Sequence, residues 1–156
     1  MIITPDIFEG EITLGQVESL SVKSSINWFI NKYEPELLNK VLGKKLATEL
    51  TEGLEADPIE DKWIALRDIM KPIIANYVYT MYQRNNTTST TGSGEVKSKA
   101  ETADRISPLS KIVRARNEMV DLIRELSCDM QNYPFNEDYP EYCPGENFKK
   151  MNVFGI

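Results

Sequence analysis

The chain contains no histidine and only two cysteines, Cys128 and Cys143. Histidine is the side chain most often used for proton transfer near neutral pH and for zinc binding, so both kinds of chemistry lose their usual residue. The two cysteines have no CxxC partner, which argues against a metal site. A disulfide between them and a pair of reduced thiols in a cytoplasmic product are both open interpretations, and the second is the simpler one.

Positive charge and long apolar runs are also scarce. The chain has 18 lysine and arginine residues against 24 aspartate and glutamate residues, for a net charge of -6. A protein that wraps DNA needs a basic face, so this balance argues against tight DNA binding. No apolar run reaches the length of a membrane-spanning helix, and the acidic N-terminal stretch lacks the basic region of a secretory signal. The 156 residues suffice for one domain with its own core.

Enzyme motifs are missing as well. The stretch TGSGEVKSK, which begins at Thr91, has glycines and lysines but not the spacing of a phosphate-binding loop. Without histidine, a serine or cysteine nucleophile lacks its usual base. The acids around Asp57 do not follow the spacing of a calcium loop and suit a solvated helix start. The sequence therefore predicts no catalytic residue, no cofactor and no metal ligand, in a protein that is not an enzyme.

Apolar residues recur at helical spacing through much of residues 17–84. A first helix begins near Ser19 or Ser21 and is expected to end before Pro35, because the residue preceding proline avoids the helical conformation. Short helices over 35–42 and 44–54 follow, with Gly43 between them as the left-handed residue that ends the first.

Two long helices complete the predicted core. The first has Asp57 as its N-cap and Pro58 at its first position, and Pro72 should kink or break it near Met70. The second covers 107–132 and carries Arg116 as the polar exception on its apolar face, so that charge must be paired or reach the rim. The sequence thus predicts an all-α bundle of about four or five helices.

Three segments do not fit helices: an N-terminal arm over 1–16, a polar stretch over 85–106 and a tail over 133–156. The polar stretch is too long for a mere connection in a compact domain. Its threonines and serines suit extended chain, so we predict a long polar loop or a β-hairpin that turns near Gly92 to Gly94. A polar loop without any partner is the alternative.

The N-terminal arm could lie along the core or along a neighbouring subunit. The aromatic tail should dock on its own core or on a partner, since disordered tails are poor in aromatics.

The order of these segments resembles the small helical head–tail connector (adaptor) proteins of tailed bacteriophages, especially the type found in phages and prophages of Bacteroidetes. The residues that carry the resemblance are WFINKYEPELLNKVLGKKLATEL from Trp28, PIIANYVYTMYQRNN from Pro72, the Thr/Ser/Gly loop, SPLSKIVRARNEMVDLI from Ser107, and the closing KKMNVFGI. The resemblance covers most of the chain and rests on the order and texture of the segments more than on an invariant motif.

The resemblance implies a structural virion protein that is assembled in the cytoplasm of the bacterial host. It implies a homo-oligomeric ring, commonly a dodecamer, which sits beneath the portal protein, extends its DNA channel and docks the next neck or tail protein. DNA would pass through this ring without specific binding, and no membrane would be involved.

The resemblance also assigns interaction roles to the loop and the tail. The loop residues are Thr87, Thr88, Thr90, Thr91, Gly92, Gly94, Val96 and Lys97. The tail residues are Tyr139, Tyr142, Phe148, Val153, Phe154 and Ile156. Negative walls repel phosphate, so the candidates for facing a channel lumen are Glu118, Asp121 and Glu125.

Two other functions remain open. A tail-completion or stopper protein of similar size would differ in where its ring sits. A helical DNA-binding packaging module would need a short turn between two helices and a basic second helix. The basic residues that such a module would use are Lys97, Lys99, Arg105, Lys111, Arg114 and Arg116.

Overall fold

The computed structural model describes residues 1–15, 19–86, 88–91, 94–97 and 109–152, with the backbone alone for the two ranges between 88 and 97. The element order is η1 (Pro5–Ile7), η2 (Gly10–Ile12), α1 (Leu20–Val41), α2 (Lys44–Glu55), α3 (Asp61–Asn86), β1 (Thr88–Thr91), β2 (Gly94–Lys97), α4 (Leu109–Asp129) and α5 (Phe135–Asp138). The predicted all-α class is confirmed.

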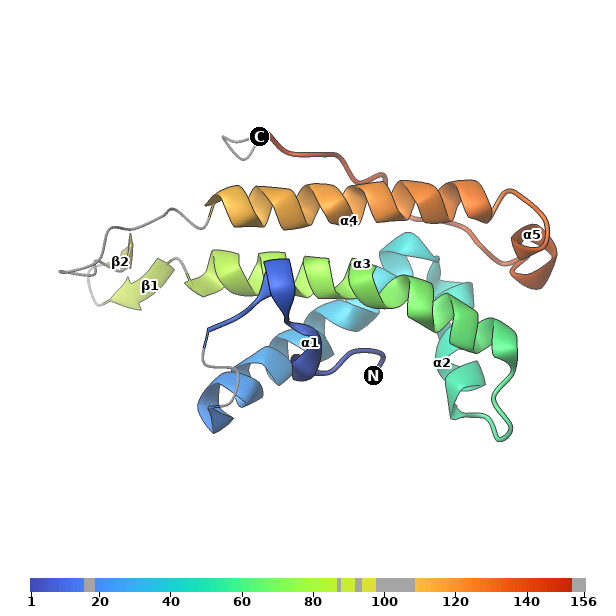
Figure 1. Ribbon diagram of the computed structural model, residues 1–156, viewed down its shortest axis with the longest axis horizontal. Helices are drawn as coiled ribbons and strands as arrows, with labels where there is room; N and C mark the ends of the chain where they lie inside the picture. The colour runs from blue at the N-terminus through green and yellow to red at the C-terminus, as the bar shows by residue number, and fades with distance from the viewer. Residues whose placement is uncertain (16–18, 87, 92–93, 98–108, 153–156) are drawn as a thin grey trace.

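Helix α3 is the centre of the bundle. It lies alongside α4 on one side and against α1 and α2 on the other (Figure 1). Every residue from Ile73 to Thr80 is therefore buried, whichever way its side chain points. A helix with neighbours on both sides is apolar nearly all round. Its fully buried partners include Ile26, Ile30, Leu37, Leu50, Met119 and Val120.

Helix α1 runs through Pro35, so the predicted break before that proline is wrong. Proline cannot donate to the carbonyl four residues earlier, that of Asn31. Both Asn31 and Pro35 are exposed, so water can satisfy the freed carbonyl. The opposite side of the helix is held by the buried Leu37 and Leu38. Packing on the core side thus outweighs the local cost of the proline.

Helix α3 starts later than predicted and passes through its own proline. Asp57 and Pro58 precede the helix, which begins at Asp61, so their assignment as N-cap and first position is wrong. The helix continues through Pro72 without a break, and its axis changes direction along its length in Figure 1. Two side chains bond back to the helix beyond the proline, Asn76 Nδ2 to the Pro72 carbonyl at 3.1 Å and Thr80 Oγ1 to the Asn76 carbonyl at 2.9 Å. Such bonds accompany helix bending.

The N-terminal arm lies along the chain's own core. Ile3, Phe8 and Leu14 are each at most 3% exposed, and all three belong to the same core cluster as the helices. The arm crosses α3 and α4 at η2. Of the two positions that the sequence left open for the arm, the structure adopts the intramolecular one.

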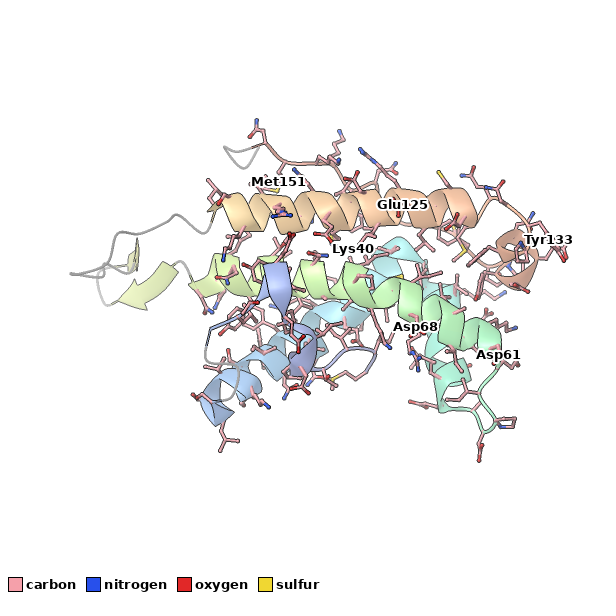
Figure 2. The ribbon with its side chains drawn as sticks, viewed as in Figure 1. Lys40, Asp61, Asp68, Glu125, Tyr133 and Met151 are labelled. Atoms are coloured by element: carbon pink, nitrogen blue, oxygen red, sulfur yellow. The ribbon has the colours of Figure 1, made fainter. Side chains whose placement is uncertain are left out.

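The tail was predicted to contain no helix, but it forms the single helical turn α5 directly after Pro134. From Tyr139 the chain runs back along α4, and Met151 lies beside the N-terminal half of that helix (Figures 1 and 2). Cys128 and Cys143 are both free and exposed. Within the described part of the chain, no helix combines the length and apolar character needed to cross a membrane.

Candidate functional site

The first candidate is the hairpin that continues α3 beyond the helical body (Figure 1). β1 and β2 pair antiparallel, with Thr88 opposite Lys97 and Thr91 opposite Gly94. The turn at 92–93 lies outside the described residues. In the part of the chain that is described, the sheet has only these two strands. Each strand then has an outer edge of backbone groups without a strand partner, and such an edge is a template for another chain.

The predicted loop contacts fall largely on these strands. Thr88, Thr90 and Thr91 lie in β1, and Gly94, Val96 and Lys97 lie in β2. Thr87 and Gly92 lie outside the described residues.

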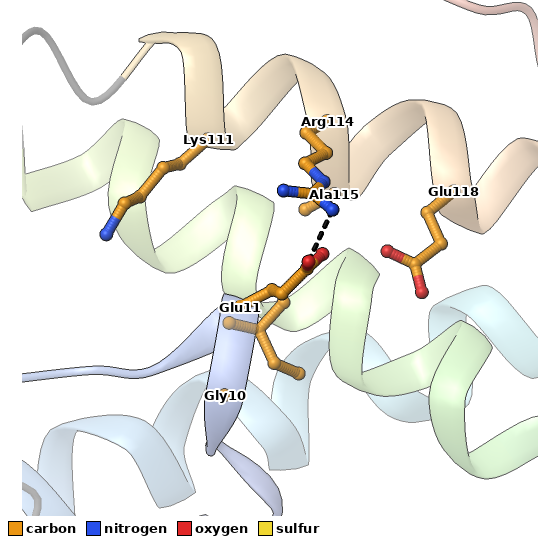
Figure 3. A pocket seen from close by; sticks show the side chains of 7 residues that line it. Gly10, Glu11, Lys111, Arg114, Ala115 and Glu118 are labelled. Carbon is orange, nitrogen blue, oxygen red and sulfur yellow. Dashed lines mark hydrogen bonds and ion pairs between the residues drawn. The ribbon is translucent and has the colours of Figure 1, made fainter.

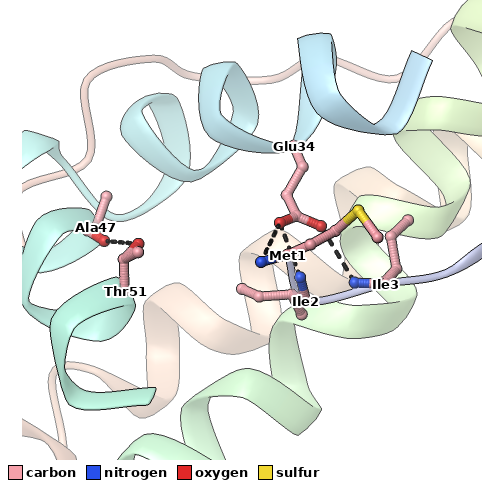
Figure 4. A network of polar contacts seen from close by, with 6 residues as sticks. All are labelled: Met1, Ile2, Ile3, Glu34, Ala47 and Thr51. Atoms are coloured by element: carbon pink, nitrogen blue, oxygen red, sulfur yellow. Dashed lines mark hydrogen bonds and ion pairs between the residues drawn. The ribbon is translucent and has the colours of Figure 1, made fainter. Parts of the chain in front are cut away.

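The second feature is a buried carboxylate that holds the N-terminal arm (Figure 4). Glu34 is 6% exposed. It accepts hydrogen bonds from the backbone N–H groups of Ile2 at 2.8 Å and Ile3 at 3.1 Å, and the Met1 amino group is 3.9 Å away. Glu34 was not among the residues predicted to be functional, because a helix was expected to end at this position. The available signal was an acid at helical spacing from Ile30, Leu37 and Leu38.

Replacing Glu34 with alanine should loosen the arm, because the buried N–H group of Ile3 and the partly buried N–H group of Ile2 lose their acceptor. We expect a loss of about 2–3 kcal/mol in the free energy of unfolding, together with faster proteolysis of the arm. Chemical denaturation and limited proteolysis measure the two effects. Glu52→Ala, on the exposed side of α2, is the matched control, and equal stability of the two variants would contradict the anchoring role.

The tail is seated by hydrogen bonds to three helices. The Tyr139 hydroxyl donates to the Lys62 carbonyl at 2.5 Å, and the Tyr142 hydroxyl lies 2.9 Å from that of Ser127. Backbone bonds join Cys143 N–H to the Leu42 carbonyl at 3.1 Å and Gly145 N–H to the Lys40 carbonyl at 2.9 Å. The Asn117 side chain pairs with both backbone groups of Met151, at 2.9 and 2.8 Å.

The predicted tail contacts therefore divide into three groups. Tyr139 is 3% exposed, and burial raises its pKa to about 12. Tyr142 and Phe148 are half-buried against the core. Val153, Phe154 and Ile156 lie outside the described residues.

Two cationic side chains join the tail to the helices. The Arg116 guanidinium lies over the Phe148 ring, 5.2 Å from its centroid, so the tail covers the polar exception on the apolar face of α4. Burial lowers the pKa of Arg116, and the nearby Tyr77 and Glu146 oppose that shift. Hydrogen bonds to Glu36 and Glu146 raise the pKa of Lys40 to about 12.

The acids predicted to face a lumen share one side of α4, because their spacing of three and four residues places them above one another. Glu118 and Glu125 are exposed. Asp121 is half-buried and is paired with Lys150 of the tail at 2.6 Å and with Arg124 at 3.7 Å. Figure 2 shows Glu125 in the C-terminal half of the helix. Glu118, Asp121 and Glu125 therefore lie close together on one side of α4. The charge of Asp121 is neutralised by Lys150 and Arg124.

Where η2 crosses the helices, the arm and α4 leave a small cavity of about 130 Å³ (Figure 3). An ion pair between Arg114 and Glu11 joins the two elements there. Figure 3 places Glu118 on one side of this pair and Lys111 on the other.

Two of the basic residues that the structure describes already have partners within the chain. Arg114 is paired with Glu11, and Arg116 lies against Phe148. Lys99 and Arg105 are outside the described residues. Among the residues that the structure does describe, no cluster of three or more cysteine or acidic side chains is arranged to hold a metal ion.

No protein-family model matches the sequence, and neither the curated proteins nor the solved structures include a match. The structural class of the chain is an all-α bundle with a hairpin that extends from its central helix, α3.

Proposed function

We propose that this protein is a structural connector of a tailed bacteriophage. In this proposal its subunits form a homo-oligomeric ring at the head–tail interface, which extends the channel of the portal protein and docks the next neck or tail protein. The subunit acts through surfaces and carries out no catalysis. Two things support the proposal: the resemblance of the sequence to head–tail connectors, and the hairpin.

The hairpin is the observation that carries the proposal. A two-stranded hairpin is marginally stable by itself in water, and this one extends beyond the helices. Pairing its outer edges with strands of a neighbouring chain would stabilise it and give a directional contact. A contact between two different surfaces of identical subunits closes into a ring when the rotation between them permits. A closed ring of identical subunits is the arrangement that the proposed connector needs.

The acidic side of α4 is consistent with a channel. Glu118 and Glu125 are exposed on the same face of one long helix. If this face lines the ring, its negative charge repels the phosphates of passing DNA and prevents tight binding. The lumen-facing role of these residues is part of the proposal. A stopper or tail-completion protein would use the same features at another level of the neck.

Light scattering of the purified protein, alone and mixed with a candidate portal protein, tests the proposal, followed by electron microscopy of any large species. We expect closed rings, either free or on the portal. A monomer that ignores the portal and retards DNA in a gel would contradict the proposal and favour the packaging module.

A further inference from the structure

The outer part of the tail, residues 143–152, lies on the outside of the helices and runs back along α4 (Figure 1). We call these residues the strap. None of them is buried, and only Phe148 and Met151 are partly covered. Tyr139, by contrast, is 3% exposed and belongs to the core cluster. Burial of apolar surface is the main term that holds a segment on a folded protein, so the strap is held more weakly than the anchor at Tyr139.

Hydrogen bonds hold the strap near both of its ends. Near its start, Cys143 and Gly145 donate their backbone N–H groups to two carbonyls at the C-terminal end of α1, at 3.1 and 2.9 Å. The last carbonyls of a helix have no partner within the helix, so the strap caps α1. Near its end, the Asn117 side chain binds both backbone groups of Met151. Once the strap is lifted, water can take its place in each of these bonds at a small net cost.

Ion pairs supply much of the remaining attachment. The Lys40 ammonium lies between two carboxylates, 3.0 Å from Glu36 of its own helix and 3.1 Å from Glu146 of the strap. Lys150 of the strap pairs with Asp121 of α4 at 2.6 Å. These side chains are between 36% and 48% exposed, and ion pairs at that exposure are weakened by dissolved salt. The strap is therefore attached by groups that respond to ionic strength.

We propose that the strap is a switch that responds to ionic strength: residues 143–152 detach from α1 and α4 as one unit, while the Tyr139 anchor and the helices stay in place. Segments with few buried apolar contacts open at a lower free energy than the core that carries them. Opening uncovers Asn117 and Arg116 on α4, since the strap binds the first and its Phe148 ring covers the second. The closed strap keeps these groups from any other molecule that approaches this side of α4. The switch belongs to the single subunit and does not depend on ring formation.

Amide hydrogen exchange of the ¹⁵N-labelled full chain tests this proposal. The probes are the amides of Cys143, Gly145 and Met151, whose hydrogen bonds require the closed strap, and that of Val78 in the core of α3. Exchange rates in a free peptide of residues 139–152 give the reference for an open strap. We expect the three strap amides to share one protection factor, far below that of Val78, because they open together. Raising sodium chloride from about 20 mM to about 500 mM should lower that factor about threefold, since salt screens the ion pairs.

Two lysine variants separate the strap from the rest of the surface. Lys40→Gln removes the pair with Glu146 and should lower the protection of the strap amides about threefold at low salt, with a smaller further response to added salt. The matched control is Lys71→Gln, which removes a pair with Asp68 within α3. The Lys40 and Lys71 side chains are 36% and 37% exposed, and the control should leave the protection of the strap unchanged.

The proposal is overturned if the strap amides exchange only as slowly as Val78, since the strap would then open only with the whole subunit. It is also overturned if they exchange as fast as the free peptide at low salt, or if the two ends of the strap are protected to different extents. The role of charge is refuted if added salt and Lys40→Gln both leave the protection of the strap unchanged.

Discussion

Removing residues 88–97 is expected to abolish assembly into a ring and to leave the helices folded. The core cluster is built from the arm, α1 to α4 and Tyr139, so the deletion spares the contacts that stabilise the subunit. Asn86 and Leu109 would remain joined by residue 87 and residues 98–108. That is ample for two neighbouring antiparallel helices, which are commonly joined by about 2–8 residues.

Circular dichroism and light scattering, alone and with the portal, measure the two halves of this prediction. The matched control replaces residues 88–97 with a Gly/Ser segment of equal length, which keeps the connection and removes the strands. If strand pairing is what matters, the control also fails to assemble. A deletion variant that still forms rings would refute the role of the hairpin, and a loss of helicity would show that the hairpin is needed for folding.

The second large effect is expected from Gly43→Ala. Gly43 has φ +86° and ψ 155°, a conformation that only glycine adopts without strain, at a cost of about 1–3 kcal/mol for other residues. A Cβ added there would also lie 2.4 Å from the Cys143 carbonyl oxygen of the docked tail. The tail or the α1–α2 junction must then move. We expect a loss of about 3 kcal/mol in the free energy of unfolding, which lowers Tm by roughly 6–12 °C.

Gly10→Ala separates backbone strain from the clash with the tail. Gly10 has φ +59°, and a Cβ there would meet no atom within 4 Å. That variant should lose only about 1 kcal/mol. Thermal unfolding compares the two variants, and trypsin cleavage after Lys149 or Lys150 reports release of the tail. If Gly43→Ala were as mild as Gly10→Ala and the tail stayed protected, the close packing of the tail at Gly43 would be refuted.

The largest error at the sequence level concerned two prolines. Pro35 was expected to end a helix, and Pro58 to begin one. Local preference is weak compared with the burial of neighbouring residues: Leu37 and Leu38 hold α1 in place on the far side of Pro35. Helix α3 also continues through Pro72, where a kink or a short break was expected, and the helices packed against both of its sides hold it together.

Glu34 illustrates what helical spacing alone does not reveal. The spacing placed it among apolar residues, but its partners are backbone N–H groups of residues more than thirty positions earlier in the chain. The tail likewise forms hydrogen bonds with residues of α3 and α4 and with Lys40 of α1. Neither could be found by examining one segment at a time.

The sequence by itself determined the all-α class, the approximate positions of α2, α3 and α4, and a long non-helical segment, either a polar loop or a hairpin, between the two long helices. These depend on local patterns: apolar residues at helical spacing, glycine at turns, and threonine and serine in extended chain. Only the tertiary structure decided that α1 continues through Pro35, that the arm and the tail lie on the chain's own helices, and that Glu34 holds the arm by its backbone N–H groups. Those outcomes depend on which surfaces far apart in the chain bury each other, and the gain from that burial exceeds the local preferences that sequence patterns express.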